Sequence, residues 1–397
     1  MQEIQILSKN KKVILALGAE SAGNFSVHLN GKIYFSQDFG DLLREKNYEK
    51  YLKELTTFLK KEKIKPNIIL TDIHPDFKTT KLGKELAKKF KAKHIPIQHH
   101  LAHIFSQIKF NSIACRLSPV TFYGIALDGT GLGTDEKVWG GEIFRIKNHE
   151  STIINIERIG NLENQIMIGG ELAIKEPSRI LISILSKFLE KEDVYKHIKE
   201  YYSKNEFELL YNQMQQNFNC IETSSAGRVL DAVSVLLGFA KNQRTHKHEA
   251  TYLLEKNSTQ PYTDLKPKII KIKEQGTKNI QSSIFDDNLE YTLNTTHLFK
   301  YLVKNIHRDK KCLTATAQLY IAQGLEKIIK KHSRNTKYQI QNTILSGGIS
   351  NNKIISEYFS KQKNKPDTSK KELGFGIPRG DAGISFGQIN YLLSKNL

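Results

Sequence analysis

Two histidines four residues apart carry the strongest chemical signal in the sequence, within the run Gln98-His99-His100-Leu101-Ala102-His103. Residues i and i+4 share one face of a helix, so His99 and His103 could bind one metal ion together. The metalloprotease version of this spacing requires a glutamate directly after the first histidine, and His100 stands there instead, which excludes that class. Two imidazoles do not complete a metal site, and the pair alone is equally compatible with core or solvated histidines.

An aspartate after a buried strand is a candidate for completing such a site. Residues 121–127 form an apolar run, and Asp128 follows it directly, before Gly129, Thr130 and Gly131. A strand end would hold the carboxylate rigidly, and the glycines would let backbone N–H groups approach phosphate oxygens, as in anion-binding nests. An ordinary Asp-Gly turn is the alternative interpretation.

A glycine pair and a capping aspartate near the C-terminus add further candidates. Gly347 and Gly348 follow the strand expected over residues 340–345 and precede a helix. Helix N-termini bind anions, and paired glycines would let a flat base or a ribose lie against the backbone; a simple strand-to-helix turn is the alternative. Asp381 would cap the last helix and keep its second carboxylate oxygen for a metal ion.

One helix start in the middle of the chain has a similar character. Gly227 lies at its beginning and Asp231 follows one turn later on the same face. Asp231 could accept hydrogen bonds from ribose hydroxyls. The alternative is a surface carboxylate on an amphipathic helix.

The elements that must position these residues alternate between strand and helix, which predicts an α/β fold. In the first half we expect strands at 12–17, 25–29, 32–35, 67–71 and 94–97, and helices at 48–61, 79–90 and 99–108. In the second half we expect strands at 121–127, 138–146 and 340–345, a largely helical stretch at 176–255, a helix at 313–331, a basic loop at 361–371 and a final helix. Both halves open with a strand, a glycine-rich turn and a returning strand, so we expect two similar lobes with a cleft between them. We place the first lobe at residues 1–118 and the second at 119–397, with a helical insertion at about 150–295.

Composition limits the classes of function. The chain has 397 residues, 39% of them hydrophobic, and lacks an apolar run of the length that spans a bilayer. The N-terminus is predicted to be a first strand and not a signal peptide. The three cysteines are far apart in sequence, which argues against a disulfide scaffold or a cysteine zinc site. A reducing cytoplasm is therefore expected. The net charge of +19 is compatible with a nucleic-acid partner, but the lysines are dispersed without an aromatic platform, so that partner is not favoured. No membrane association is expected.

Seven motifs in order resemble the C-terminal carbamoyltransferase domain of the hydrogenase maturation factor HypF. They are IHPDFKTT (73–80), IPIQHHLAHIFS (95–106), ALDGTGLGTDEKVWGGE (126–142), GGELAIKEPSR (169–179), TSSAGRVLDAVSVLLG (223–238), LSGGISNN (345–352) and PRGDAGISFGQ (378–388). The resemblance extends from about residue 12 to residue 392. That domain is related to the TsaD-type tRNA threonylcarbamoyltransferases and to antibiotic O-carbamoyltransferases. The resemblance implies a two-lobed actin-like, sugar-kinase-like fold with a ribonuclease H-like sheet in each lobe.

The resemblance also implies a set of site residues and ligands. A divalent metal ion, Fe or Zn, would be held by the catalytic residues His99, His103, Asp128 and Asp381. The nucleotide, carbamoyl-adenylate or ATP or AMP, would lie along Gly227, Asp231, Gly347, Gly348 and Asn352, with its phosphate at Gly129, Thr130 and Gly131. Gly169, Glu176 and Arg179 match a further motif whose role does not follow from the residues.

The implied function is transfer of a carbamoyl group from carbamoyl-adenylate to an acceptor, which in HypF is the C-terminal cysteine of HypE in [NiFe]-hydrogenase maturation. We expect a stand-alone transferase without the YrdC-like, acylphosphatase and zinc segments, so a separate YrdC-like protein would supply the donor. The alternatives are a small-molecule or tRNA acceptor, or a non-catalytic nucleotide-binding module. The sequence differs from the family pattern at three places. Ser21-Ala22-Gly23-Asn24 stands where a Lys-Asn-Thr-like stretch is usual, and His246-Lys247-His248-Glu249-Ala250 stands where Tyr-Glu-Gly-x-Ala is usual. Lys353 stands where arginine is usual.

Overall fold

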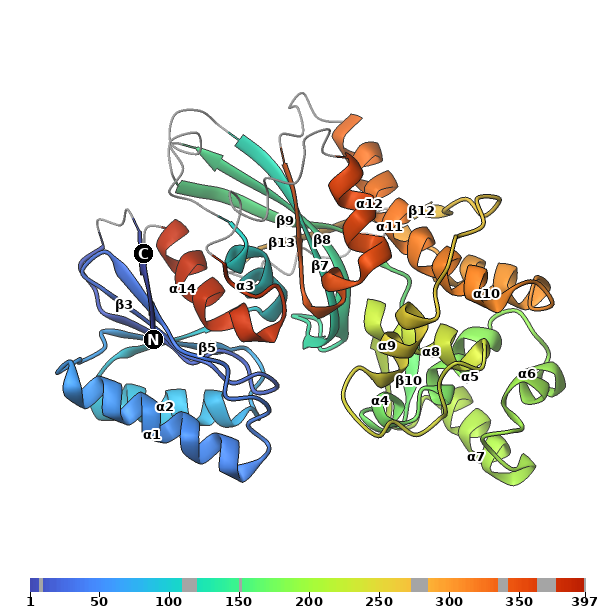
Figure 1. Cartoon of the computed structure of the whole chain (residues 1–397), viewed down its shortest axis with the longest axis horizontal. Helices are drawn as coiled ribbons and strands as arrows, with labels where there is room; N and C mark the ends of the chain where they lie inside the picture. Colours follow the sequence, from blue (N-terminus) through green and yellow to red (C-terminus); the bar gives the residue numbers. More distant parts are fainter. Residues whose placement is uncertain are drawn as a thin grey trace.

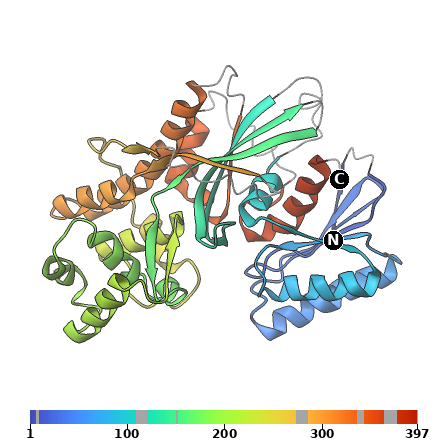
Figure 2. The ribbon, with the colours of Figure 1, turned by 180° about the vertical axis from the view of Figure 1, so that it is seen from behind.

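The computed structural model describes residues 1–6, 10–108, 120–149, 152–272, 285–334, 342–362 and 376–395. It contains two lobes, each built on its own β-sheet, and two helices lie between the sheets (Figure 1 and, from behind, Figure 2). The expected two-lobed α/β architecture is therefore confirmed. The predicted lobe boundary and the basic loop fall wholly or largely on residues outside the described ranges, so the boundary stays a prediction.

The first lobe contains a six-stranded sheet in the order β1-β4-β3-β2-β5-β6. The strands are β1 (Gln2–Gln5), β2 (Ile14–Ala16), β3 (Ser26–Leu29), β4 (Lys32–Phe35), β5 (Ile68–Asp72) and β6 (Lys93–Ile97). The predicted hairpin forms as β3 and β4, because Asn30 and Gly31 adopt the positive φ angles that a tight two-residue turn requires. Strand β2 pairs in parallel with β5, which in turn pairs in parallel with β6.

Alternation along the strands of this sheet divides the buried side chains between two cores. Leu15 and Ile69 pack on one side with the helices α1 (Glu45–Lys61) and α2 (Lys78–Phe90). Ile14 and Leu70 pack on the other side with the helices α3 (His99–Ser106) and α14 (Ile384–Ser394). The last helix of the chain thus returns to the first lobe, and Figure 1 shows α3 and α14 side by side between the two sheets.

The second lobe is built around β7 (Val120–Leu132), β8 (Val138–His149), β9 (Thr152–Leu162) and β14 (Asn342–Ser346). Strands β7, β8 and β9 are antiparallel, and β14 pairs in parallel with β7. The pairing of β7 with β8 shifts register between Leu127 and Gly131. Asp128 was expected at the end of the strand; it lies instead at this irregularity, and such bulges redirect side chains.

The insertion expected to be helical over about 150–295 is mixed, which corrects that prediction. It contains β9, β10 (Gln165–Ile168), β11 (Cys220–Thr223), β12 (Ile269–Lys271) and β13 (Asp286–Leu293). Its helices are α4 (Leu172–Lys175), α5 (Ser178–Leu185), α6 (Lys191–Ile198), α7 (Lys204–Gln215), α8 (Ala226–Leu236) and α9 (Glu249–Lys256). Helices α10 (Thr295–Lys304), α11 (Lys310–Arg334) and α12 (Lys353–Gln362) follow. Strand β9 was missed because polar side chains on it are buried in pairs, such as Arg158 with Glu142, and leave no clear alternation.

The close approach of α3 and α14 fixes the helix that carries the histidine pair. A Cβ atom on Gly387 would lie 1.8 Å from the carbonyl oxygen of Ala102, so only glycine allows this contact. The Nδ2 group of Asn390 donates hydrogen bonds of 2.7 Å to the carbonyl oxygens of Phe105 and Ile108. Helix α3 is therefore held closely against α14, and it also contacts β7. Within the described ranges, none of the helices combines the length and apolar character that crossing a membrane needs.

Candidate metal centre

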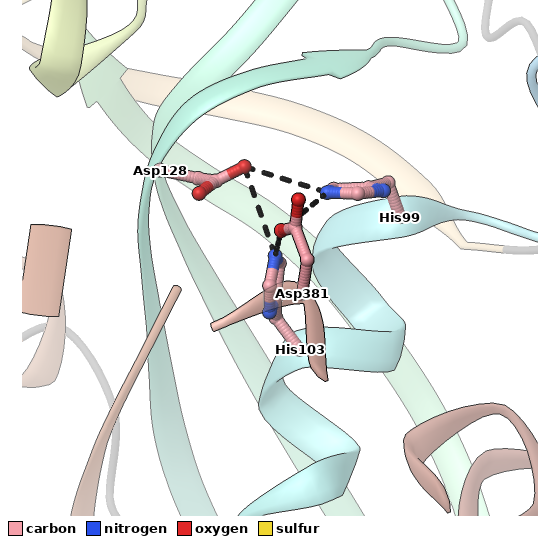
Figure 3. Close-up of side chains that lie close together, drawn as sticks. All are labelled: His99, His103, Asp128 and Asp381. Atoms are coloured by element: carbon pink, nitrogen blue, oxygen red, sulfur yellow. Dashed lines mark ion pairs between the residues drawn. The ribbon is translucent and has the colours of Figure 1, made fainter. Parts of the chain in front are cut away.

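Four side chains from distant parts of the sequence converge where the two lobes meet. His99 and His103 come from α3, Asp128 from β7, and Asp381 from the short turn Asp381–Gly383 before α14. Figure 3 shows the two carboxylates pointing at the Nε2 atoms of the two imidazoles. One ligand atom from each residue lies within 4.8 Å of all the others.

The individual distances are those of a cluster around a common centre. The Oδ2 atom of Asp128 lies 3.4 Å from His99 Nε2 and 3.7 Å from His103 Nε2. The Oδ1 atom of Asp381 lies 3.8 Å and 3.3 Å from the same two nitrogens. Three of the residues are buried and the Asp381 side chain is 19% exposed, so the centre opens to solvent on one side only.

Each imidazole is held by its other nitrogen. His99 Nδ1 lies 2.6 Å from Asp72 Oδ2, and His103 Nδ1 lies 3.1 Å from the carbonyl oxygen of Arg379. A neutral imidazole that donates from Nδ1 presents a lone pair at Nε2, which is the form that ligates metals. The carbonyl of Arg379 also accepts the N–H of Gly347, so the glycine pair supports the orientation of His103.

The Nε2 atoms of His99 and His103 are buried and have no hydrogen-bond partner among the described atoms. Buried polar atoms without partners are rare because each costs free energy, and a cation bound between them would satisfy both. Two imidazoles and two carboxylates are a donor set that suits Zn or Fe. The residues therefore fit a metal ion, and their role as its ligands stays a prediction.

The electrostatics of the cluster agree with this fit. Burial by itself would lower the pKa of His99, but the carboxylates of Asp72 and Asp128 outweigh it and raise that pKa well above its usual value. Burial would raise the pKa of Asp128, but the imidazoles of His103 and His99 beside it hold that pKa well below its usual value. Protons on the imidazoles thus balance the carboxylates without a metal ion, and a bound divalent ion would replace them.

His100, between the two histidines in sequence, does not join them. Its Nδ1 atom lies 3.0 Å from Gln98 Nε2, and its ring lies 5.9 Å from that of Trp139. Burial and the neighbouring His99 lower its pKa well below the usual value, so this ring is neutral. The position that holds the glutamate in a metalloprotease is thus occupied here by a packed histidine.

Sequence reasoning missed Asp72, which directly follows the strand expected at 67–71. A signal existed, because β5 and β6 are parallel with Asp72 opposite Ile97, two residues before His99. Polar residues at the carboxyl ends of neighbouring parallel strands meet at one edge of the sheet. The Asp72 side chain is 1% exposed, and its second oxygen accepts the backbone N–H of His74 at 2.9 Å.

We expect replacement of Asp72 by alanine to weaken binding of Zn²⁺ about 10- to 100-fold, because outer carboxylates orient a ligating histidine and raise its basicity. Competition with a chelating dye measures this affinity. Asp76→Asn is the matched control: this carboxylate belongs to the same turn, its side chain is 78% exposed, and it lies 3.6 Å from Lys81 Nζ. An Asp72→Ala protein that stays folded and binds Zn²⁺ as tightly as the wild type would contradict the assigned role.

A cavity of about 540 Å³ adjoins the cluster and is lined from both lobes. Ser21 and Ala22 contribute to it from the first lobe, and Asp128 and Asp381 form part of its wall. Among the predicted nucleotide-binding residues, Gly348 and Asn352 line it. The Gly348 N–H donates to Asp128 Oδ1 at 3.2 Å, which links the cavity wall to the cluster.

Gly131, Gly227 and Gly347 pack around the site without lining this cavity. A Cβ atom on Gly131 would lie 2.7 Å from His99 Cδ2. A Cβ atom on Gly227 would lie 2.9 Å from the Cα atom of Gly129. A Cβ atom on Gly347 would lie 2.1 Å from the carbonyl oxygen of Leu127. These positions therefore allow close packing around the cluster. Gly129 and Thr130 are also outside the cavity lining. Their proposed nucleotide contacts stay predictions.

Two further predicted groups lie elsewhere. Asp231 is 1% exposed and forms ion pairs with Arg228 and Arg244 through Oδ2, so it is not a surface carboxylate, and its ribose contact stays a prediction. Glu176 and Arg179 form an ion pair of 2.7 Å in a second surface cavity, away from the cluster. Gly169 packs against Arg179 with a φ angle of +79° and belongs to that region.

Comparisons with known proteins agree on one protein family. A family model described as "HypF Kae1-like domain" matches residues 9–109, and one described as "Carbamoyltransferase, Kae1-like Domain, second subdomain" matches residues 124–388. The probable carbamoyltransferase HypF of Methanocaldococcus jannaschii is 35% identical, over 99% of this chain and 48% of that protein. Carbamoyltransferase HypF2 of Cupriavidus necator is 28% identical, over 63% of this chain and 29% of that protein.

Solved structures give the same result for the fold. Full-length HypF in its phosphate- and nucleotide-bound form superimposes with a TM-score of 0.80 at 24% identity, over 99% of this chain and 47% of that one. HypF of T. kodakarensis superimposes with a TM-score of 0.78 at 28% identity, over 99% and 48%. The chain thus spans about half the length of these relatives.

Proposed function

The chain belongs to the HypF carbamoyltransferase family, and from this premise we propose that it transfers a carbamoyl group from carbamoyl-adenylate to an acceptor. The observation that supports this most is the buried cluster of two histidines and two aspartates at the wall of a cavity lined from both lobes. The volume of this cavity, about 540 Å³, is within the range of pockets that bind nucleotide-sized ligands.

The residues of the cluster suit an acyl transfer. A divalent ion bound there would supply Lewis-acid polarisation of a carbonyl or phosphate oxygen of the donor. Asp72 and the carbonyl of Arg379 fix the directions of His99 and His103, so the ligand atoms need no reorganisation during the reaction. Burial of the cluster limits access of water, which would otherwise hydrolyse a reactive donor.

The chemistry needs no nucleophile from the protein. AMP is a good leaving group, so the acceptor can attack the carbamoyl carbon directly. Among the described residues, Cys220 and Cys312 are half-buried, and neither lines the cavity. We propose that His99, His103, Asp128 and Asp381 hold Fe or Zn, and that Gly348 and Asn352 contact the nucleotide.

We propose the C-terminal cysteine of a HypE-like protein as the acceptor, in the maturation of a [NiFe] hydrogenase, with a YrdC-like protein or domain as the source of the adenylate. The support is the family membership and the 35% identity to a HypF protein over nearly the whole chain. The net charge of +19 is compatible with tRNA as a second candidate acceptor.

The test supplies carbamoyl-adenylate to the metal-loaded protein and asks by mass spectrometry which acceptor gains a carbamoyl group. The acceptors are a HypE C-terminal peptide, the same peptide with serine in place of its cysteine, bulk tRNA and an aminoglycoside. We expect carbamoylation of the cysteine peptide alone. Transfer to tRNA or the aminoglycoside would replace the proposed acceptor, and tight nucleotide binding with no transfer to any of them would indicate a non-catalytic binding module.

A further inference from the structure

One lysine crosses the cavity from the second lobe to the first. Lys247 Nζ donates a hydrogen bond of 3.2 Å to the carbonyl oxygen of Ser21, in the glycine-rich turn after β2. Both residues line the cavity beside the metal cluster. Lys247 therefore bridges the lobes at the mouth of the cavity, close to where the carboxylates of Asp128 and Asp381 face its interior.

The backbone around Lys247 holds it in this position. The next residue, His248, adopts a left-handed conformation with φ of 65° directly before α9, which turns the chain sharply at the cavity. The carboxylate of Glu249 accepts a hydrogen bond of 3.0 Å from the hydroxyl of Thr245 and closes the loop onto the start of α9. The direction of Lys247 is thus set by local structure as well as by its contact with Ser21.

The ammonium group keeps hydrogen-bonding capacity for a ligand. An ammonium carries three N–H donors, and Ser21 is the one partner for Lys247 in the part of the chain that the structure describes. The first-lobe residues facing it in the cavity, Ser21 and Ala22, are small and leave it uncovered, and Lys247 is exposed. The remaining donors can therefore meet a ligand in the cavity.

The other charges of the cavity are largely committed. Asp128 and Asp381 belong to the metal cluster, where two carboxylates balance one divalent ion. The carboxylate of Glu255 accepts hydrogen bonds from the side chain of Asn352 and the backbone N–H of Lys353. With Arg379 also in the wall, the cavity around a bound ion carries a net positive charge and favours an anion.

We propose that Lys247 binds the phosphate of the adenylate donor, so that one side chain recognises the phosphate and joins the two lobes over it. This inference rests on the proposed function, because it assigns a residue to the donor of that reaction. A purely structural contact between the lobes would predict the same hydrogen bond to Ser21 but no preference for a phosphate. Comparing a nucleotide with its nucleoside separates the two roles.

The experiment measures binding of AMP and of adenosine by calorimetry to the Zn²⁺-loaded protein, in the wild type and in three variants. We expect Lys247→Ala to weaken AMP binding about 10-fold or more, since hydrogen bonds between charged groups are the strong ones. Adenosine affinity should change less than about twofold, and Lys247→Arg should keep AMP affinity within about threefold, because it retains the charge. Lys241→Ala is the matched control, on the same loop but outside this cavity, and should change neither affinity.

Two results would overturn the inference while leaving the carbamoyl-transfer proposal intact. One is an unchanged AMP affinity in Lys247→Ala, and the other is an equal loss for AMP and adenosine, which would make Lys247 structural. A wild-type protein that fails to bind AMP and to transfer the carbamoyl group would overturn both proposals together. Circular dichroism of each variant confirms that it is folded before binding is compared.

Discussion

Replacing both His99 and His103 with alanine should abolish stoichiometric binding of a divalent ion and lower the rate of carbamoyl transfer by a factor on the order of 10³, since Lewis-acid stabilisation contributes several kcal/mol. Only two carboxylates would remain of the four ligands, and they would be close together in a buried site without a counter-charge. Metal content by mass spectrometry and transfer to the cysteine peptide measure the two effects on the same samples.

The matched control for this pair is His246→Ala. His246 lies on the loop before α9, its side chain is 63% exposed, and it does not line the cavity. We expect its metal content and its rate to equal those of the wild type. A folded double variant that is free of metal and still transfers the carbamoyl group at the normal rate would reject the mechanism.

Removing the charge of Arg158 should have the largest effect on stability. Its Nε group donates a hydrogen bond of 2.8 Å to Glu142, which is 0% exposed, and its guanidinium lies 3.9 Å from the centre of the Trp139 ring. Substitution by methionine keeps most of the volume but leaves the Glu142 carboxylate buried without its cation. We expect Arg158→Met to lower the free energy of unfolding by about 3–5 kcal/mol, the usual cost of breaking a buried ion pair.

Urea denaturation of the metal-free proteins measures this change, and a double variant gives the control. Glu142→Gln combined with Arg158→Met removes both charges, so it should be more stable than Arg158→Met alone. An Arg158→Met protein that unfolds at the same urea concentration as the wild type would contradict the assigned role. A double variant less stable than Arg158→Met would show that the loss comes from packing and not from the unpaired charge.

The sequence predicted local features well where chemistry and geometry are set by neighbouring residues. The hairpin at Asn30-Gly31 and the helix from His99 follow from turn chemistry and spacing, and both were found within two residues of the predicted ends. The convergence of His99 and His103 with Asp381 could not be derived from spacing, because it depends on the return of α14 to the first lobe. The family resemblance supplied that grouping.

The parts that sequence reasoning missed depend on pairing between distant residues. Strand β9 carries Glu157, Arg158 and Asn161, which are polar yet buried, because partners on neighbouring strands satisfy them. Asp231, for which a surface position was the alternative to a ribose contact, is buried and paired with two arginines. Such partners are visible only once the strands and helices are placed in three dimensions.

The central claim is that four side chains from both lobes hold one divalent ion beside the cavity. X-ray diffraction from crystals grown with Zn²⁺, recorded at the zinc absorption edge, tests it directly. We predict one strong anomalous peak within about 2.0–2.2 Å of the Nε2 atoms of His99 and His103 and of one oxygen each from Asp128 and Asp381. A peak on other residues, or none at this cluster at saturating Zn²⁺, would contradict the account.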